Sequence, residues 1–244
     1  MQFMPTQSAP DRRKSAFTLV EMLIVIAIMS ILMTAGTIGL NGMGGKSVTS
    51  GVTSAESLFD EARTIAVGRN IRACVLVSNS LTNNHGDDRR RVLVASEEVD
   101  DKTGLPISSP DQEPTWVLTT RGTVLPDKVY FSALFSKKNQ TGGGGEIDKI
   151  SDDKIKNVTT GYKGSYFIYQ FNDQGICKTP GASFILGTGS RNPGKSATVD
   201  EPRVTGEAKR DFGGFVVRRS GRTSLFRSTD QMPGLEHLNA GAKF

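Results

Sequence analysis

The feature that most constrains this chain is an apolar run of 24 residues from Phe17 to Leu40. Glu21 is the only charged residue in the run, and a basic cluster at residues 12–14 stands just before it. As a helix, such a run reaches about 36 Å at about 1.5 Å per residue, which exceeds the roughly 30 Å hydrocarbon core of a bilayer. Positive charge precedes the run, and the next charge comes only at Lys46. We therefore expect a single membrane pass with the N-terminus in the cytoplasm and the rest of the chain outside.

Three interpretations of this segment compete. A secretory signal peptide normally has a shorter apolar core without an acid, and a plain single-pass anchor leaves Glu21 equally unexplained. A carboxylate near the bilayer interior costs about 2.5 to 3.5 kcal/mol on insertion scales. Glu21 is therefore expected to have a positively charged partner, which the third interpretation supplies.

Residues 16–23, Ala-Phe-Thr-Leu-Val-Glu-Met-Leu, resemble the processing site of type IV prepilins and type II secretion pseudopilins. In that family a membrane peptidase cuts before the apolar run and N-methylates the new terminal residue. The resemblance implies a cut between Ala16 and Phe17, with Phe17 methylated and Glu21 as the fifth mature residue. The family usually has glycine before the cut, and Ala16 departs from this pattern. In a filament, Glu21 of an incoming subunit would pair with the Phe17 amine of its neighbour and set the register.

The resemblance also implies a location and a set of partners. The expected location is the inner membrane, with a periplasmic C-terminal domain, followed by a filament in the periplasm or at the cell surface. The expected partners are the prepilin peptidase and methyltransferase, other pilin or pseudopilin subunits, the inner-membrane assembly platform, and lipid before assembly. The expected function is that of a structural subunit, of the minor type, in a type IV pilus-like or type II pseudopilus filament.

Together, the composition and the prepilin resemblance imply a leader at 1–16, a transmembrane and assembly helix at 17–40, a Gly-rich segment with an amphipathic helix at 41–70, and a β domain at 71–244. Six glycines between residues 36 and 51 predict either a frayed helix or a flexible tether.

A T-x-x-E capping box at Thr53 and Glu56 predicts that a helix begins there. Its apolar stripe, from Ala55 to Ala66, is expected to pack on a sheet, and the helix should end near Gly68.

The remainder of the chain has the alternation typical of strands. Strands are expected at 71–78, 91–96, 115–125, 129–135, 165–172 and 183–187, with polar loops at 79–90, 99–113, 140–156 and 189–209. A hairpin is expected at 215–226, turning at Ser220-Gly221. The predicted fold is therefore α+β: a long N-terminal helix, transmembrane and then amphipathic, packed against an antiparallel β-sheet domain, as in pilins.

Three pieces extend the resemblance. Residues 58–77, 171–175 and 216–222 resemble the helix-to-strand passage, a strand end and the closing hairpin of minor pseudopilins of the GspH/FimT type. A pilin-like protein of the Verru_Chthon cassette would fit equally well.

Other candidate sites are fewer. Cys74 and Cys177 fall in or next to expected strands, where either a disulfide or two separate buried thiols would be compatible with the sequence. Arg218, Arg219 and Arg222 on the hairpin are candidates for contact with nucleic-acid phosphates, with a solubilising surface as the alternative. Some minor pilins of this type bind DNA, so the alternative function is that of a minor pilin that binds DNA or a surface through this basic hairpin.

Residues 189–196 match the G-x-x-x-x-G-K-S spacing of a phosphate-binding loop, but no helical pattern follows, which favours a surface loop. No catalytic or metal-ligating set is assembled, so the sequence predicts no enzyme, metal site or cofactor.

Overall fold

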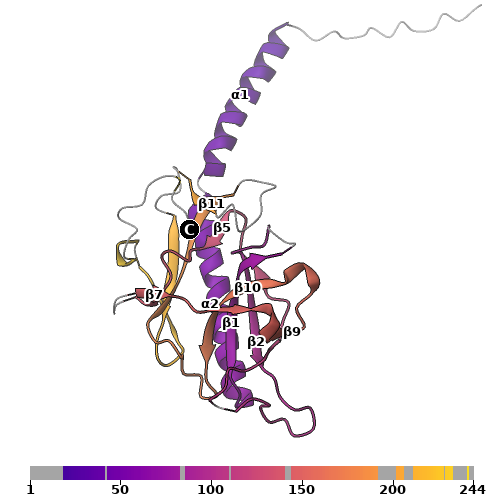
Figure 1. Cartoon of the computed structure of the whole chain (residues 1–244). Coiled ribbons are helices and arrows are strands. Elements are labelled where there is room, and N and C mark those ends of the chain that lie inside the picture. The colour runs from indigo at the N-terminus through magenta and orange to yellow at the C-terminus, as the bar shows by residue number, and fades with distance from the viewer. Residues whose placement is uncertain are drawn as a thin grey trace, which may run out of the picture. The chain divides into compact units, whose positions relative to one another are not determined.

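The computed structural model of the chain describes residues 19–41, 43–82, 86–109, 111–140, 144–191, 202–205, 211–227, 229–232 and 241 (Figure 1). The chain divides into two compact units, Met1–Met43 and Gly44–Phe244.

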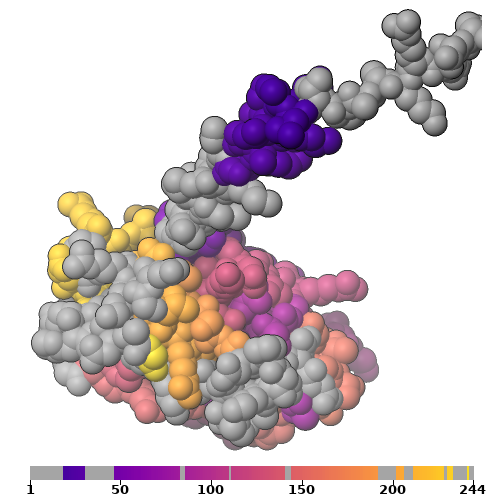
Figure 2. Space-filling view, turned by 90° about the horizontal axis from the view of Figure 1, so that it is seen from above, coloured from indigo at the N-terminus to yellow at the C-terminus, as the bar shows by residue number. Residues whose placement is uncertain are grey.

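The first unit contains α1 (Leu19–Asn41), the helix formed by the apolar run. Residues 19–30 are all exposed, and Leu19, Ile26 and Met29 have exposed fractions of 79%, 59% and 60%. Figure 2 shows these twelve residues in indigo. Apolar side chains follow one another around the helix without a polar stripe, a pattern typical of a helix surrounded by apolar material. Within the described ranges, no helix meets the combined requirements of length and apolar character for crossing a membrane. A transmembrane segment at 17–40 thus stays a prediction.

The second unit is built from α2 (Met43–Arg69) and two main sheets. The larger sheet has the order β8-β10-β1-β2-β3-β9, with β4 paired beside β2. Its strands are β1 (Ala73–Leu81), β2 (Arg91–Glu97), β3 (Trp116–Leu118), β4 (Thr123–Val124), β8 (Lys149–Ser151), β9 (Ile155–Lys156) and β10 (Gly164–Phe171).

The second sheet has the order β12-β11-β13-β14, with β5 also paired to β11. Its strands are β5 (Val129–Phe131), β11 (Ala182–Ser190), β12 (Arg203–Val204), β13 (Phe212–Val217) and β14 (Thr223–Leu225). A separate ribbon pairs β6 (Lys137–Asn139) with β7 (Gly144–Glu146), and short 3₁₀ turns are η1 (Asp152–Lys154), η2 (Thr160–Tyr162) and η3 (Thr229–Gln231).

The main core lies where α2 packs against both sheets (Figure 1). Phe59 of α2 is fully buried, and its ring contacts Tyr169 of β10 and Phe184 and Phe215 of the second sheet, with centroids 5.1, 5.4 and 4.9 Å away. The predicted apolar stripe of this helix is therefore confirmed. Because one helix joins the two sheets, its burial holds the domain together.

The described residues of the Gly-rich segment, 36–41 and 43–51, are helical, contrary to the expectation of a frayed helix or a tether. The second helix begins at Met43, so Thr53 lies in its interior, and the Thr53 hydroxyl donates a 3.1 Å hydrogen bond to the carbonyl oxygen of Thr49. The predicted capping box is therefore wrong.

Close packing explains why the glycines at the start of α2 are helical. Val48 and Val52 of α2 are buried, with exposed fractions of 3% and 5%. A Cβ atom at Gly213 of β13 would lie only 3.0 Å from Val48, and one at Gly51 would lie 3.2 Å from Leu186. Burial of these apolar side chains offsets the poor helix propensity of the glycines.

The predicted α+β class is confirmed, and a strand lies within or across each predicted range. The range 115–125 is split into β3 and β4, because Gly122 has a φ of 69°. The expected loop at 140–156 instead contains β7, β8 and β9. Among the pairings of the described strands, the one between β3 and β9 is parallel and the others are antiparallel.

Candidate functional site

The predicted processing and assembly residues lie at the start of the chain. Ala16 and Phe17 are outside the described residues, whereas Glu21 lies in the first turn of α1 and is exposed. It is the only charged residue in that helix. The N-terminal end of a helix carries a partial positive charge, which favours a carboxylate at this position. Val20 and Met22 beside it are 63% and 54% exposed, so Glu21 lies within an apolar surface that another chain or lipid can cover.

The C-terminal hairpin is formed by β13 and β14, as predicted, with Phe215 opposite Leu225. Its turn packs closely on the domain, since a Cβ atom at Gly221 would lie 2.2 Å from a carbonyl oxygen. Gly221 also has a φ of 74°, a conformation that favours glycine. Arg63 of α2 donates from Nε to the Ser220 carbonyl oxygen over 3.0 Å. The hairpin is thus held against the C-terminal half of α2.

The three arginines predicted on the hairpin are all exposed, but the structure does not group them as one set. Arg218 and Arg219 line a groove of about 770 Å³, whereas Arg222 does not. Arg227 completes the groove, which we call the arginine groove. Arg218 donates to the Ser224 hydroxyl over 3.1 Å, which fixes its direction. Arg227 follows β14 in the sequence, and the return of the chain after that strand brings it to this groove.

Cys74 and Cys177 are both free and buried, so the structure contains no disulfide between them. Successive residues of a strand point to opposite faces, and Cys74 of β1 faces the core on the outer side of the larger sheet, whereas Cys177 belongs to the main core. Burial raises the pKa of both thiols, which keeps them protonated. Within the described ranges, no group of three or more His, Cys, Asp or Glu side chains is placed to hold a metal ion.

Comparison with protein families places a Prokaryotic N-terminal methylation motif at residues 11–37. A comparison with curated proteins finds none that matches the chain. Among solved structures, the chain is similar to the minor pseudopilin EpsH from the type II secretion system of Vibrio cholerae. The two share 10% sequence identity with a TM-score of 0.35, over 75% of this chain and 95% of that one. An identity and a score this low support no conclusion about function.

The matched motif contains Ala16, Phe17 and Glu21, the residues singled out by the sequence. The chain therefore carries a prepilin-type N-terminal methylation motif, as the resemblance at residues 16–23 predicted.

Proposed function

We propose that this chain is a minor structural subunit of a type IV pilus-like or type II secretion pseudopilus filament. The observation that supports this function best is the helix α1, most of which lies within the matched methylation motif and whose apolar side chains at residues 19–30 are exposed. Exposed apolar surface of this kind is stabilised by lipid before assembly and by the helices of neighbouring subunits afterwards.

In this proposal the prepilin peptidase cuts between Ala16 and Phe17 on the cytoplasmic side of the inner membrane. The β domain lies in the periplasm, and the assembly platform then moves the subunit into the filament. The new Phe17 amine is cationic and can pair with Glu21 of the next subunit. Because a charge without a partner in an apolar environment is strongly unfavourable, this pair would fix the register between subunits.

The N-terminus of the natively processed protein tests maturation. Mass spectrometry should find an N-terminal N-methyl-Phe17, and an intact leader would contradict the proposal.

The replacement Glu21→Gln tests the register, because it keeps the size of the side chain and removes its charge. Leaving a buried ion pair with one partner costs about 3 to 5 kcal/mol, so Glu21→Gln should be processed normally but should be lost from sheared filaments. Ser30→Ala is the matched control, since Ser30 lies in the same helix, is exposed and uncharged, and donates from its hydroxyl to the Ile26 carbonyl oxygen. Normal incorporation of Glu21→Gln would refute the pairing.

The arginine groove supports a second candidate function, in which the subunit binds DNA or another polyanion on the filament surface. Arg218, Arg219 and Arg227 lie around one groove, and clustered guanidinium groups bind phosphates in a salt-dependent manner.

Arg222 supplies a matched control for this second function, because it is exposed on the same hairpin but outside the groove. Gel retardation of DNA by the full chain should weaken when Arg218, Arg219 and Arg227 are replaced with glutamine, and the effect should shrink at high salt. Equal weakening by Arg222→Gln would indicate nonspecific charge, and absence of retardation would exclude this function.

A further inference from the structure

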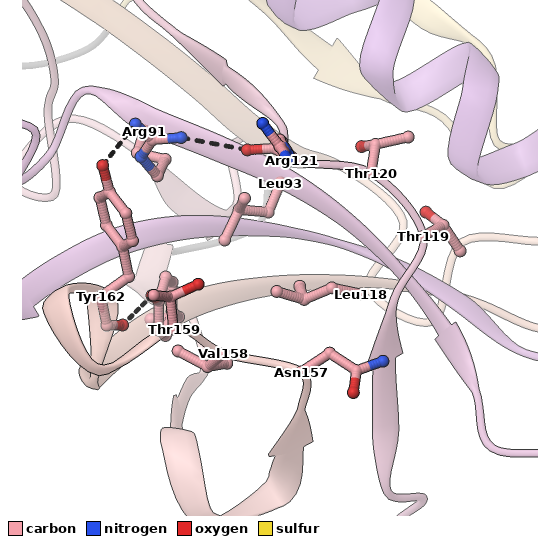
Figure 3. Close-up of a pocket in the computed structure, with 11 residues that line it drawn as sticks. Arg91, Leu93, Leu118, Thr119, Thr120, Arg121, Asn157, Val158, Thr159 and Tyr162 are labelled. Atoms are coloured by element: carbon pink, nitrogen blue, oxygen red, sulfur yellow. Dashed lines mark hydrogen bonds between the residues drawn. The ribbon is translucent and has the colours of Figure 1, made fainter.

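A second hollow, which we call the tyrosine cavity, lies on the outer face of the larger sheet and has a volume of about 610 Å³ (Figure 3). Leu93 and Tyr166, which are both buried, and Leu118 give it an apolar floor. One wall is the connection between β3 and β4, and the other is the chain from residue 157 through η2. Its volume lies within the roughly 300 to 1,000 Å³ typical of small-molecule sites.

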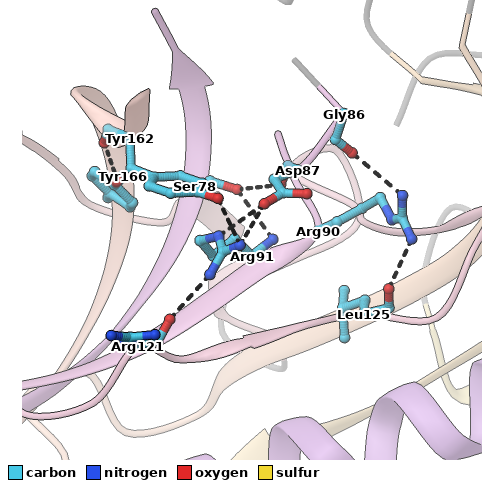
Figure 4. Close-up of polar contacts among 9 residues, drawn as sticks. All are labelled: Ser78, Gly86, Asp87, Arg90, Arg91, Arg121, Leu125, Tyr162 and Tyr166. Atoms are coloured by element: carbon cyan, nitrogen blue, oxygen red, sulfur yellow. Dashed lines mark hydrogen bonds and ion pairs between the residues drawn. The ribbon is translucent and has the colours of Figure 1, made fainter. Parts of the chain in front are cut away.

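Arg91 of β2 ties both walls together (Figure 4). Its Nη1 atom donates to the Arg121 carbonyl oxygen over 3.0 Å, and Nη2 donates to the Tyr162 hydroxyl over 3.0 Å. The guanidinium also lies over the Tyr162 ring, 4.2 Å from its centroid. Asp87 accepts bonds from Nε and Nη2 at 3.0 and 2.5 Å and balances the charge. The separation of the walls is therefore set without a ligand, which lowers the entropic cost of binding.

The backbone of the walls is equally constrained. Gly122 has a φ of 69°, and a Cβ atom there would lie 2.3 Å from the Val92 carbonyl oxygen, so this wall lies directly on β2. Asn157 in the opposite wall has a φ of 66°. Residues in the left-handed region cluster where surrounding structure holds a site in shape.

The polar groups around the tyrosine cavity are mainly donors that the fold leaves available. The Tyr162 oxygen accepts from Arg91, so its own proton can point to a ligand. Arg121 is exposed and forms no salt bridge with the described part of the chain. Among the residues that the structure describes, no Asp or Glu lines the cavity. Because Asp87 balances Arg91, the lining has one uncompensated positive charge, which suits one carboxylate.

We propose that the tyrosine cavity binds a uronate-type sugar unit, which is a saccharide ring carrying one carboxylate. The carboxylate would bind the Arg121 guanidinium and the Tyr162 hydroxyl. The C–H face of the ring would lie on Leu93 and Leu118, and the ring hydroxyls would bond to Asn157 and to nearby threonine hydroxyls of both walls. A phosphate suits the site less well, because it carries more negative charge and has no apolar body. The site does not depend on filament assembly.

Titration of the full chain with glucuronate tests the proposal, in a detergent without a sugar headgroup. Calorimetry measures the affinity, and the fluorescence of Trp116 gives a second signal, since it is the only tryptophan and packs in the cluster that includes Leu118. Glucose is the uncharged counterpart of the probe, and benzoate is a carboxylate on a ring without hydroxyls.

The variant Arg121→Gln removes the charge but keeps the backbone bond to Arg91. Arg222→Gln is the control, because Arg222 is an exposed arginine outside the cavity. We expect saturable binding of glucuronate, with affinity at least about tenfold lower for glucose and in Arg121→Gln, and unchanged in Arg222→Gln.

Failure of glucuronate to saturate, equal affinity for glucose, or unchanged affinity in Arg121→Gln would each overturn the proposal. Tighter binding of benzoate than of glucuronate would overturn the assignment to a saccharide. None of these results bears on cleavage at Phe17 or on filament assembly, so they leave the proposed function standing.

Discussion

Replacing Phe59 with alanine is expected to lower the free energy of unfolding of the β domain by about 3 to 5 kcal/mol. The side chain is fully buried and its ring meets Tyr169, Phe184 and Phe215 within 5.4 Å. Part of this loss of free energy comes from the buried apolar surface of the ring. Another part comes from aromatic pairing, which contributes about 0.5 to 1.5 kcal/mol for each pair. The loss of stability should lie at the upper end of this range. Two sheets and a helix meet at the Phe59 ring, and they cannot all move in to fill the cavity that alanine would leave.

Urea unfolding of the full chain in detergent, followed by Trp116 fluorescence, measures this loss. For a domain of this size, the midpoint temperature of thermal unfolding should also fall by roughly 2 to 4 °C for each kcal/mol of stability lost. Val67→Ala is the matched control, since Val67 lies in the same helix but is 52% exposed, and it should change stability by less than about 0.5 kcal/mol. A loss below about 1 kcal/mol in Phe59→Ala, or an equal loss in Val67→Ala, would refute the view that α2 joins the two sheets.

Three further outcomes are expected. Gly221→Ala should destabilise the domain by about 1 to 3 kcal/mol in urea unfolding, whereas Gly104→Ala, at a similar φ of 68° but in open space, should lose about 1 kcal/mol or less. Cys74 and Cys177 should resist iodoacetamide in the native chain and both react after denaturation without reductant; no reaction in urea would indicate a disulfide. Burial raises the pKa of Tyr169 above its ordinary value. The folded state therefore favours the protonated phenol, and the free energy of unfolding should fall as the pH rises above about 10; a rise in urea titrations would contradict this.

The sequence allowed the class of the fold to be predicted because strand periodicity is local. Residues 91–97 and 164–171 alternate β-branched or aromatic side chains, and both form strands within one residue of the expected bounds. The apolar stripe of α2 could be predicted equally well, because the spacing of its apolar residues follows the helical period of about 3.6 residues.

The start of α2 could not be predicted from local propensity. Six glycines between residues 36 and 51 indicate an unstable helix. The helix forms because Val48 and Val52 pack on Gly213, which lies more than 150 residues further along the chain. Rules based on neighbouring residues fail here because the contact joins two segments that are distant in sequence. Glycines in both segments permit their close approach, and neither segment by itself indicates that the other will pack on it.

The candidate sites divide in the same way. The processing motif is a contiguous string, so the sequence showed it directly. The arginine groove and the tyrosine cavity each combine segments that are distant in sequence, such as Arg91 with Tyr162. Their single residues look like ordinary surface positions, and only strand pairing shows which of them converge.

The apolar residues of α1 and α2 serve different purposes, although the two helices follow one another in the chain. The apolar face of α2 is used within the domain, where Phe59 and its neighbours contact both sheets. The apolar residues of α1 have no such partner within residues 19–30, because each of these is exposed. Changes to the core should therefore act through folding of the β domain, whereas Glu21→Gln should leave its unfolding curve unchanged and act on assembly alone. This separation follows because assembly through α1 leaves the contacts of α2 with the two sheets in place.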